Sequence, residues 1–182
     1  MLPNLNERPA MILYGKLQES YLKALNEMKK AEKICIISHR RPDADAVGAN
    51  LALRYMLEEE GKMVVSACVD APPKDSLFLP LAKSFVVDFD YDNFDLIISV
   101  DCGDLKLVKF HEEKPEIVSG KKPFINIDHH YSNNGFGTIN LVNPKACSTC
   151  IIIYDFLQYA GAEIDRHMAT ALLHGIYFDT GG

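Results

Sequence analysis

In the stretch Ile125-Asn126-Ile127-Asp128-His129-His130, a short apolar run ends abruptly in one carboxylate and two imidazoles. The apolar half predicts a short buried strand, which would hold the three polar side chains rigidly at one edge of a sheet. Carboxylate oxygens and imidazole nitrogens together suit a divalent metal ion. Alone, the triplet is better explained as a polar loop after a strand. A metal site therefore needs further ligands from other segments.

The composition is that of a globular protein. The 182 residues are enough for one domain with a sizeable core. The net charge of -6 argues against a broad basic surface for nucleic acid, but not against a small nucleotide, because bound metal ions supply positive charge locally. No apolar run approaches the ~20 residues of a membrane span. The first ten residues lack an apolar signal region, and the five cysteines lie mostly in or beside apolar runs, so we expect reduced thiols in a cytoplasmic protein.

Apolar runs and helical patterns alternate along the chain. Buried strands are predicted at residues 34–37, 63–69, 84–87, 96–100 and 124–127. Helices are predicted at about 14–30, 46–60, 106–113, 151–159 and 166–177. This alternation predicts an α/β fold, a doubly wound, mainly parallel sheet with helices on both faces. In such sheets ligands bind outside the carboxyl ends of the strands.

Metal-binding side chains follow three of these strands, and the last helix adds one more. The candidate ligands at this edge are His39, Asp43, Asp45, Asp101, His129, His130 and Asp179. So many carboxylates would repel one another without cations. Two divalent ions that share one carboxylate would neutralise them. Oxygen and imidazole donors without a thiolate favour Mn²⁺, with Mg²⁺ or Co²⁺ as substitutes. Two such ions, roughly 3.5–4 Å apart, form a phosphoryl-transfer site.

Four motifs in this order resemble the DHH phosphoesterase family. They are HRRPDADAVG (39–48), VDCGD (100–104), DHH (128–130) and GIYFDTG (175–181). Together they span almost the whole chain from residue 34 onward. The resemblance is greatest to the bacterial oligoribonuclease and 3′-phosphoadenosine-5′-phosphate phosphatase branch of the family.

The resemblance implies a role for each candidate residue. His39, Asp43 and Asp101 would bind one Mn²⁺. The second ion would be held by Asp45, Asp101, His129 and Asp179, with Asp101 as the bridge. A hydroxide between the ions would attack phosphorus in line. Asp101 and His130 are thus the expected catalytic residues, and His130 would orient the substrate phosphate or help the leaving group.

Three further residues have a less direct expected role. Asp128 is assigned to orienting a histidine through a hydrogen bond. Arg40 and Arg41 either contact a substrate phosphate or are solvated loop charges. The resemblance also implies that residues 1–182 are the catalytic domain, with a helical lead-in over about 1–31. The family's smaller C-terminal substrate-binding domain would be absent from this chain.

The expected function is a Mn²⁺-dependent phosphoesterase that acts on short oligoribonucleotides or nucleotide 3′-phosphates. The same site would serve a cyclic or linear dinucleotide phosphodiesterase or an inorganic pyrophosphatase. An alternative of another class is a metal-binding or nucleotide-sensing regulatory module without catalysis. The expected partner is a short RNA oligonucleotide or a small nucleotide, and a homodimer is a further possibility.

Simpler roles compete for some of these residues. Asp43 or Asp45 would cap the helix that follows, and Asp104 is interpreted as an N-cap. Cys147 and Cys150 form a lone C-x-x-C motif, which we interpret as packing rather than as a zinc or redox site because no second pair exists.

Overall fold

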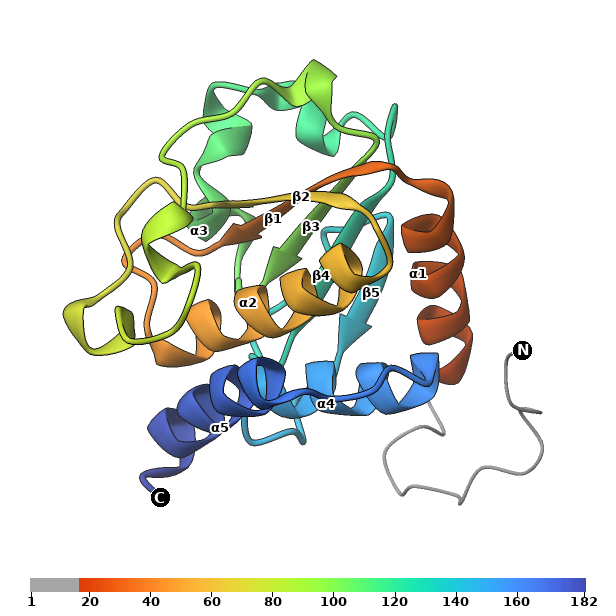
Figure 1. The fold of residues 1–182 in the computed structure, drawn as a ribbon. Helices are drawn as coiled ribbons and strands as arrows, with labels where there is room; N and C mark the ends of the chain where they lie inside the picture. Colours follow the sequence, from red (N-terminus) through yellow and green to blue (C-terminus); the bar gives the residue numbers. More distant parts are fainter. Residues whose placement is uncertain (1–16) are drawn as a thin grey trace.

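The apolar runs form a five-stranded parallel sheet in the computed structural model, which describes residues 17–182 (Figure 1). Across the sheet the strands are β2 (Met63–Ala67), β1 (Lys33–Ser38), β3 (Leu96–Val100), β4 (Phe124–Asp128) and β5 (Ile139–Val142). The strands β3 and β4 are buried throughout, and β1 is buried except at its first residue, as continuous apolar runs predict. The chain reverses its direction of winding between β1 and β3. In such sheets this point of reversal is where ligands bind.

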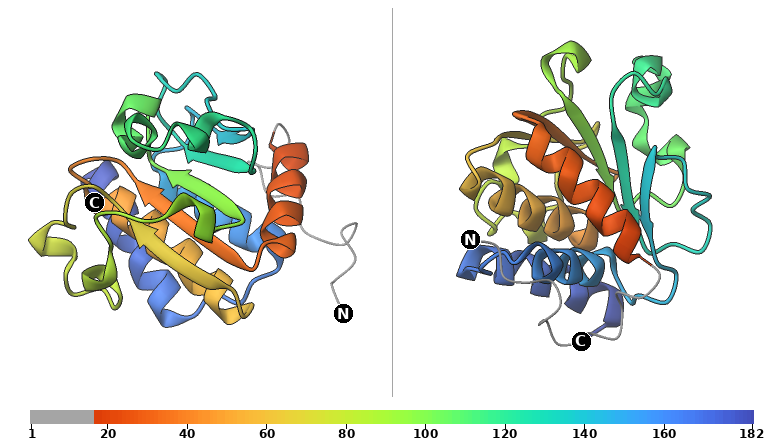
Figure 2. Two further views of the ribbon diagram at one scale, coloured as in Figure 1. Left: turned by 90° about the horizontal axis from the view of Figure 1, so that it is seen from above. Right: turned by 90° about the vertical axis from the view of Figure 1, so that its right-hand side faces the viewer.

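The longer helices gather on one side of the sheet (Figures 1 and 2). They are α1 (Gln18–Lys30), α2 (Ala44–Glu59), α4 (Thr149–Ala160) and α5 (Arg166–Thr180). Ile34 and Ile36 of β1 belong to the core on this side. Helix α2 lies against β1 and β2, and α5 lies against α2 and α4 rather than on the sheet. Within residues 17–182, no helix combines the length and the apolar character needed to cross a membrane.

The opposite face is covered by short segments. These are α3 (Leu105–Val108) and 3₁₀ helices at Tyr91–Asn93, Phe110–Glu112 and Pro115–Val118. The rings of Phe89, Phe94 and Phe110 meet edge to face and share a second core with Cys35 and Ile37 of β1. Helices therefore cover both faces, as predicted, but on this face they are only about one turn long.

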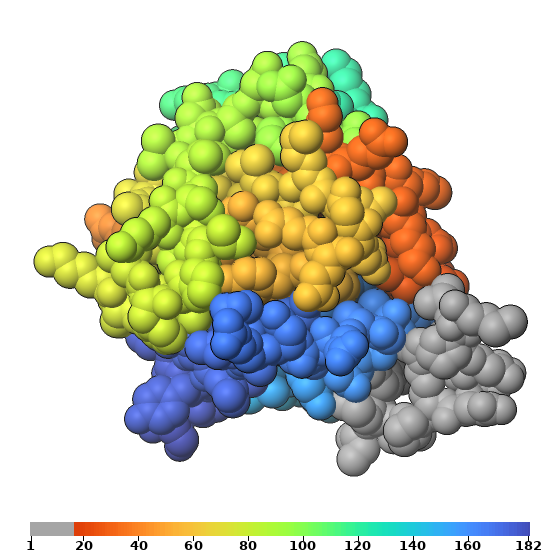
Figure 3. Space-filling view, viewed as in Figure 1, coloured from red at the N-terminus to blue at the C-terminus, as the bar shows by residue number. Residues whose placement is uncertain are grey.

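Helices α2 and α5 cross unusually closely at two glycines. A Cβ atom on Gly48 would lie 2.4 Å from the carbonyl oxygen of Ala171. A Cβ atom on Gly175 would lie 2.4 Å from Cys150 Sγ and 2.7 Å from Asp45 Oδ1. The two helices form one continuous surface in the space-filling view (Figure 3). Because only glycine fits here, α5 can bring its last turn close to the start of α2.

Several boundaries differ from the predictions. Asp43 accepts hydrogen bonds from the backbone N–H groups of Asp45 and Ala46, so α2 begins at Ala44 rather than at Ala46. Asp45 therefore lies in the first helical turn, not in a loop. Asp104 caps α3 as predicted, because it accepts a hydrogen bond from Lys106 N. The predicted start of the first helix lies outside the described residues, as does most of the proposed lead-in.

One strand prediction and one helix prediction were wrong, and one strand was not predicted. The strand predicted at residues 84–87 is a single bridge between Ala67 and Val86. Strand β5 was not predicted. The helix predicted at residues 106–113 breaks at Lys109, whose φ is 62°, a left-handed conformation that interrupts an α-helix.

Candidate metal centre

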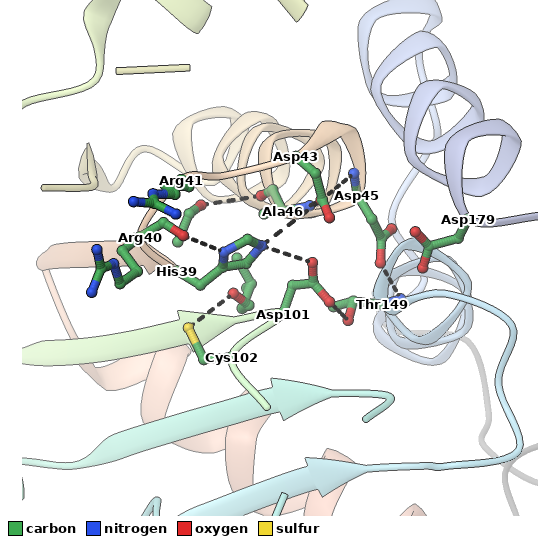
Figure 4. A network of polar contacts seen from close by, with 12 residues as sticks. His39, Arg40, Arg41, Asp43, Asp45, Ala46, Asp101, Cys102, Thr149 and Asp179 are labelled. Atoms are coloured by element: carbon green, nitrogen blue, oxygen red, sulfur yellow. Dashed lines mark hydrogen bonds and ion pairs between the residues drawn. The ribbon is translucent and has the colours of Figure 1, made fainter. Parts of the chain in front are cut away.

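His39 begins the loop after β1 and presents one ring nitrogen to the carboxylates (Figure 4). Its Nδ1 lies 2.7 Å from the carbonyl oxygen of Arg40. When Nδ1 donates this hydrogen bond, the lone pair of Nε2 is free to bind a metal. Nε2 lies 3.5 Å from Asp101 Oδ2 and 3.8 Å from Asp43 Oδ1.

Asp101 follows β3 and stands at the centre of the cluster. Its side chain is only 2 % exposed, and its φ of 59° places the backbone in the left-handed region, which most residues avoid. A hydrogen bond from its N–H to the carbonyl of Ile127 holds this backbone in place. Its Oδ1 lies 3.6 Å from Nε2 of His129 and 3.6 Å from Nδ1 of His130. The two oxygens of Asp101 therefore face different histidines.

A second group of candidate ligands includes residues from the two crossed helices. Asp45, in the first turn of α2, is fully buried. Asp179, in the last turn of α5, lies with Oδ2 at 3.3 Å from Nε2 of His129. The carboxylates of Asp45 and Asp179 lie beside each other in Figure 4. The close helix crossing is what brings residues so distant in sequence together.

All six predicted ligands thus converge at the carboxyl edge of the sheet. Possible ligand atoms lie within 4.8 Å of one another in three overlapping groups, which are His39/Asp43/Asp101, Asp45/His129/Asp179 and Asp101/His129/His130. The donors are hard oxygens and imidazole nitrogens, which fit Mn²⁺ or Mg²⁺. The nearby thiols of Cys102 and Cys150 are buried, and burial raises their pKa well above the usual range, so they stay protonated.

The charges of the cluster also fit a cation site. Burial, together with the charge of Asp101, raises the pKa of Asp45 to about 7. Burial alone would lower the pKa of His39, but hydrogen bonds to Asp101 and Asp43 outweigh it and raise that pKa to about 10. The carboxylates would therefore repel one another strongly unless protons or other positive charges lie among them.

His130 is oriented by Asp128. The fully buried Asp128 accepts a hydrogen bond of 2.8 Å from His130 Nδ1. This bond raises the pKa of His130 to about 9. Asn133 donates a 2.7 Å hydrogen bond to the other oxygen of Asp128. Asp128 belongs to none of the three groups found among the described residues, whereas the half-exposed His130 belongs to one.

Arg40 and Arg41 are not brought to the carboxylates. Figure 4 shows both guanidinium groups directed away from the cluster. The loop is held by its backbone, since Arg40 N donates to the carbonyl of Leu107 and Arg41 N donates to Asp70 Oδ2.

Sequence reasoning missed Thr149 and Asn133. The Oγ1 atom of Thr149 donates a 2.9 Å hydrogen bond to Asp101 Oδ1. Thr149 lies inside the C-x-x-C motif, which was interpreted only as packing, and Cys150 is indeed buried whereas Cys147 is exposed. Ser148, which caps α4, is a recognisable helix-start signal. The sequence does not indicate which side chains that helix start would face.

Comparisons with known proteins agree with this arrangement. Residues 33–176 match the family described as "DHH family, N-terminal domain". The chain is 32% identical over 151 residues to the bifunctional oligoribonuclease and PAP phosphatase of Thermus thermophilus, covering 81% of this chain and 43% of that protein. It is 24% identical over 160 residues to a probable manganese-dependent inorganic pyrophosphatase of Streptococcus agalactiae, covering 81% and 48%.

A solved structure has the same fold. The crystal structure of an exopolyphosphatase-related protein from Bacteroides fragilis superposes with a TM-score of 0.82 at 26% identity. The match covers 91% of this chain and 51% of that one. The chain thus spans about half the length of the relatives it matches, or somewhat less.

Proposed function

Because the chain belongs to the DHH family, whose N-terminal domain covers residues 33–176, we propose that it is a metal-dependent phosphoesterase. The substrates we propose are short oligoribonucleotides or nucleotide 3′-phosphates. The observation that carries this proposal is the convergence of six carboxylate and imidazole side chains in two groups, with Asp101 lying 3.5 Å from His39 of the first group and 3.6 Å from His129 of the second. The name of the Thermus thermophilus relative supports the choice of substrates.

Two Mn²⁺ ions are the proposed cofactors. His39, Asp43 and Asp101 would hold one, and the other would be held by Asp45, Asp101, His129 and Asp179. The mixture of oxygen and imidazole donors and the name of the Streptococcus agalactiae relative support manganese. When bound, such ions supply Lewis-acid activation of water and neutralise charge on the phosphate.

In this proposal, Asp128 orients the ring of His130, and His130 supplies a proton to the substrate. Asp128 accepts a hydrogen bond from His130 Nδ1–H, which leaves Nε2 of the half-exposed ring to face a substrate. Since its pKa is raised to about 9, His130 carries a proton at neutral pH and can donate it to a phosphate or a leaving oxygen. Arg40 and Arg41 point away from the cluster, so we assign them to substrate phosphates other than the one that reacts. We further propose a cytoplasmic protein, in line with its five free cysteines.

A substrate panel tests the proposal. The natural full-length protein is incubated with Mn²⁺ and, separately, a dinucleotide, a five-nucleotide RNA, 3′-phosphoadenosine-5′-phosphate, cyclic di-AMP and pyrophosphate. We expect release of mononucleotides from RNA or of phosphate from the 3′-phosphate, and no release after chelation. Hydrolysis of pyrophosphate alone would instead identify a pyrophosphatase. No hydrolysis of any substrate would refute the enzyme and favour a regulatory module.

A further inference from the structure

The start of helix α4 is inserted between the carboxylates of the two ligand groups. The backbone N–H of Thr149 donates a 2.6 Å hydrogen bond to Asp45 Oδ2, and that of Cys150 donates a 3.0 Å hydrogen bond to Asp45 Oδ1. The hydroxyl of Thr149 donates a 2.9 Å hydrogen bond to Asp101 Oδ1. Thr149, Cys150 and Asp45 are fully buried, so these bonds have no competition from water.

These bonds suit carboxylates that must stay charged and fixed. The first N–H groups of a helix have no partner within the helix, and the helix dipole places partial positive charge there. Both stabilise the negative charge of Asp45, which burial otherwise opposes. Helix α4 runs for twelve residues and is capped by Ser148, so its first turn is well defined.

The Thr149 hydroxyl bonds to only one of the two oxygens of the Asp101 carboxylate. The oxygen Oδ1, which accepts the bond from Thr149, lies toward His129, and Oδ2 lies toward His39. Rotation about the last side-chain torsion would break the Thr149 bond and turn both oxygens out of these directions. The division of the two oxygens between the two groups suits a carboxylate that would bridge two ions with one oxygen on each.

We propose that Thr149 is a positioning residue of the metal centre. Its hydroxyl fixes the rotation of Asp101, so that each oxygen faces one ion, while its backbone N–H holds Asp45. The inference rests on the proposed function only in assuming that two divalent ions bind; it does not depend on the substrate. Groups that hold metal ligands from behind typically change metal affinity about 10–100-fold when they are removed.

Two substitutions separate the hydroxyl from the rest of the side chain. Thr149→Val keeps the shape and the backbone N–H but removes the hydroxyl. Thr149→Ser keeps the hydroxyl but removes the methyl group. Thr170→Val is the matched control, because Thr170 lies on the exposed side of α5 and, within residues 17–182, its hydroxyl bonds only to the carbonyl of Arg166.

The readout is Mn²⁺ binding by titration calorimetry, with the metal alone as the probe. We expect Thr149→Val to weaken at least one Mn²⁺ site about tenfold or more. Thr149→Ser and Thr170→Val should bind within about twofold of the natural protein. Thermal melting of each metal-free variant shows whether it is folded. A loss of stability without a change in Mn²⁺ affinity would show a merely structural hydroxyl and overturn the inference.

Other outcomes are equally decisive. Equal loss of affinity in Thr149→Val and Thr149→Ser would overturn the inference, because the hydroxyl would not be the cause. If Thr149→Val does not fold, a crystal structure of the natural protein with Mn²⁺ decides: Thr149 Oγ1 must remain bonded to an Asp101 carboxylate that has one oxygen on each ion. A protein that shows the Thr149 effect but hydrolyses no substrate would support the inference and refute the proposed enzyme. A natural protein that binds no Mn²⁺ would refute both.

Discussion

Asp101 combines burial, a left-handed backbone and contacts with three histidines, and this combination makes it the most informative single position in the chain. Left-handed residues other than glycine are costly and cluster at functional sites. The surrounding structure must hold this conformation, and the hydrogen bonds from Asp101 N to Ile127 and from Thr149 to Asp101 do so.

Asp101→Asn tests the bridge. The substitution keeps the shape but removes the charge that both ions would share, so we expect turnover to fall at least about a hundredfold. Mn²⁺ content, measured by elemental analysis, should fall for both sites. Asp104→Asn is the control, because Asp104 only caps the short helix α3. Two bound ions and a normal rate in Asp101→Asn would show that the bridging role is wrong.

The two adjacent histidines should separate in function. His129 faces Asp101 and Asp179, whereas His130 is turned by Asp128. We expect His129→Ala to lose Mn²⁺. His130→Ala should keep both ions but lower kcat by about 10²–10⁴-fold, the usual size of a proton-transfer contribution. Calorimetry and rate measurements on the same preparations check this, and equal metal loss in both variants would contradict it.

Metal affinity should rise with pH. The folded-state pKa of Asp45 is raised to about 7 and that of His39 to about 10, both above their ordinary values of about 3.9 and 6.5. The metal-free fold therefore binds extra protons, and the stability from the paired His39 charge is present below about pH 6.5 and lost as pH rises through about 10. Ligands must be deprotonated, so Mn²⁺ binding releases protons.

Calorimetry in two buffers of different ionisation enthalpy at pH 6 and pH 8 measures this release. We expect at least one proton released per protein at pH 6, fewer at pH 8, and tighter Mn²⁺ binding at pH 8. Affinity that is independent of pH would contradict the protonation of this cluster in the metal-free protein.

The positions of Asp45 and Asp179 depend on the close packing of α5 against α2. Gly175→Ala places a methyl group where Cys150 Sγ and Asp45 Oδ1 already lie, so we expect it to destabilise the fold by about 1–3 kcal/mol. The same change at an exposed helix position would stabilise by up to about 1 kcal/mol. Because Asp179 is carried by the same helix, Mn²⁺ binding should weaken too. Urea unfolding and metal titration measure the two effects, with Thr170→Ala as the control in α5.

Strands with continuous apolar runs and the longer helices with a helical pattern could be predicted from the sequence. Elements whose position or end depends on contacts distant in sequence could not. Strands β1, β3 and β4 are buried on both faces and read directly from the sequence. Strand β5 is a short edge strand that includes the polar Asn140, whose side chain bonds to Asn126 and Gly137. Its local signal is only the three apolar residues of a four-residue segment, which is too short to distinguish a strand from a loop. The break at Lys109 likewise depends on the packing of Val108 and Phe110 into the second core.

The clustering of the candidate ligands could be predicted because each stands near the end of a recognisable strand or helix. Of the residues that support them, Asp128 was predicted to orient a histidine, but Thr149 and Asn133 were not predicted. Thr149 and Asp101 are far apart in sequence, and their bond depends on how α4 meets the sheet. Whether Asp43 or Asp45 would cap α2 was also undecided from sequence, since both residues suit a helix start. In the structure Asp43 caps α2, and Asp45 instead accepts a hydrogen bond from the backbone N–H of Thr149 at the start of α4.

Divalent metal should stabilise the whole domain. Crowded carboxylates destabilise the metal-free fold, and a ligand that binds only the folded state adds about 2.7 kcal/mol at a concentration of 100 Kd. For a domain of this size, that corresponds to a rise in Tm of roughly 5–10 °C. Thermal melting with Mn²⁺ and with a chelator checks this, and Asp101→Asn should show little rise. An equal rise in that variant would place the ions elsewhere.

The order of the ligands along the chain has a consequence for biosynthesis. The first is His39, after the first described strand, and the last is Asp179, in the final turn of α5. A nascent chain on the ribosome exposes His39, Asp43 and Asp45 long before their partners have been made. The centre is complete only once α5 has emerged and docked on α2. Stable loading with the proposed Mn²⁺ ions would therefore be a late step in the maturation of this domain, and its fidelity would depend on the ions present after translation of this domain is finished.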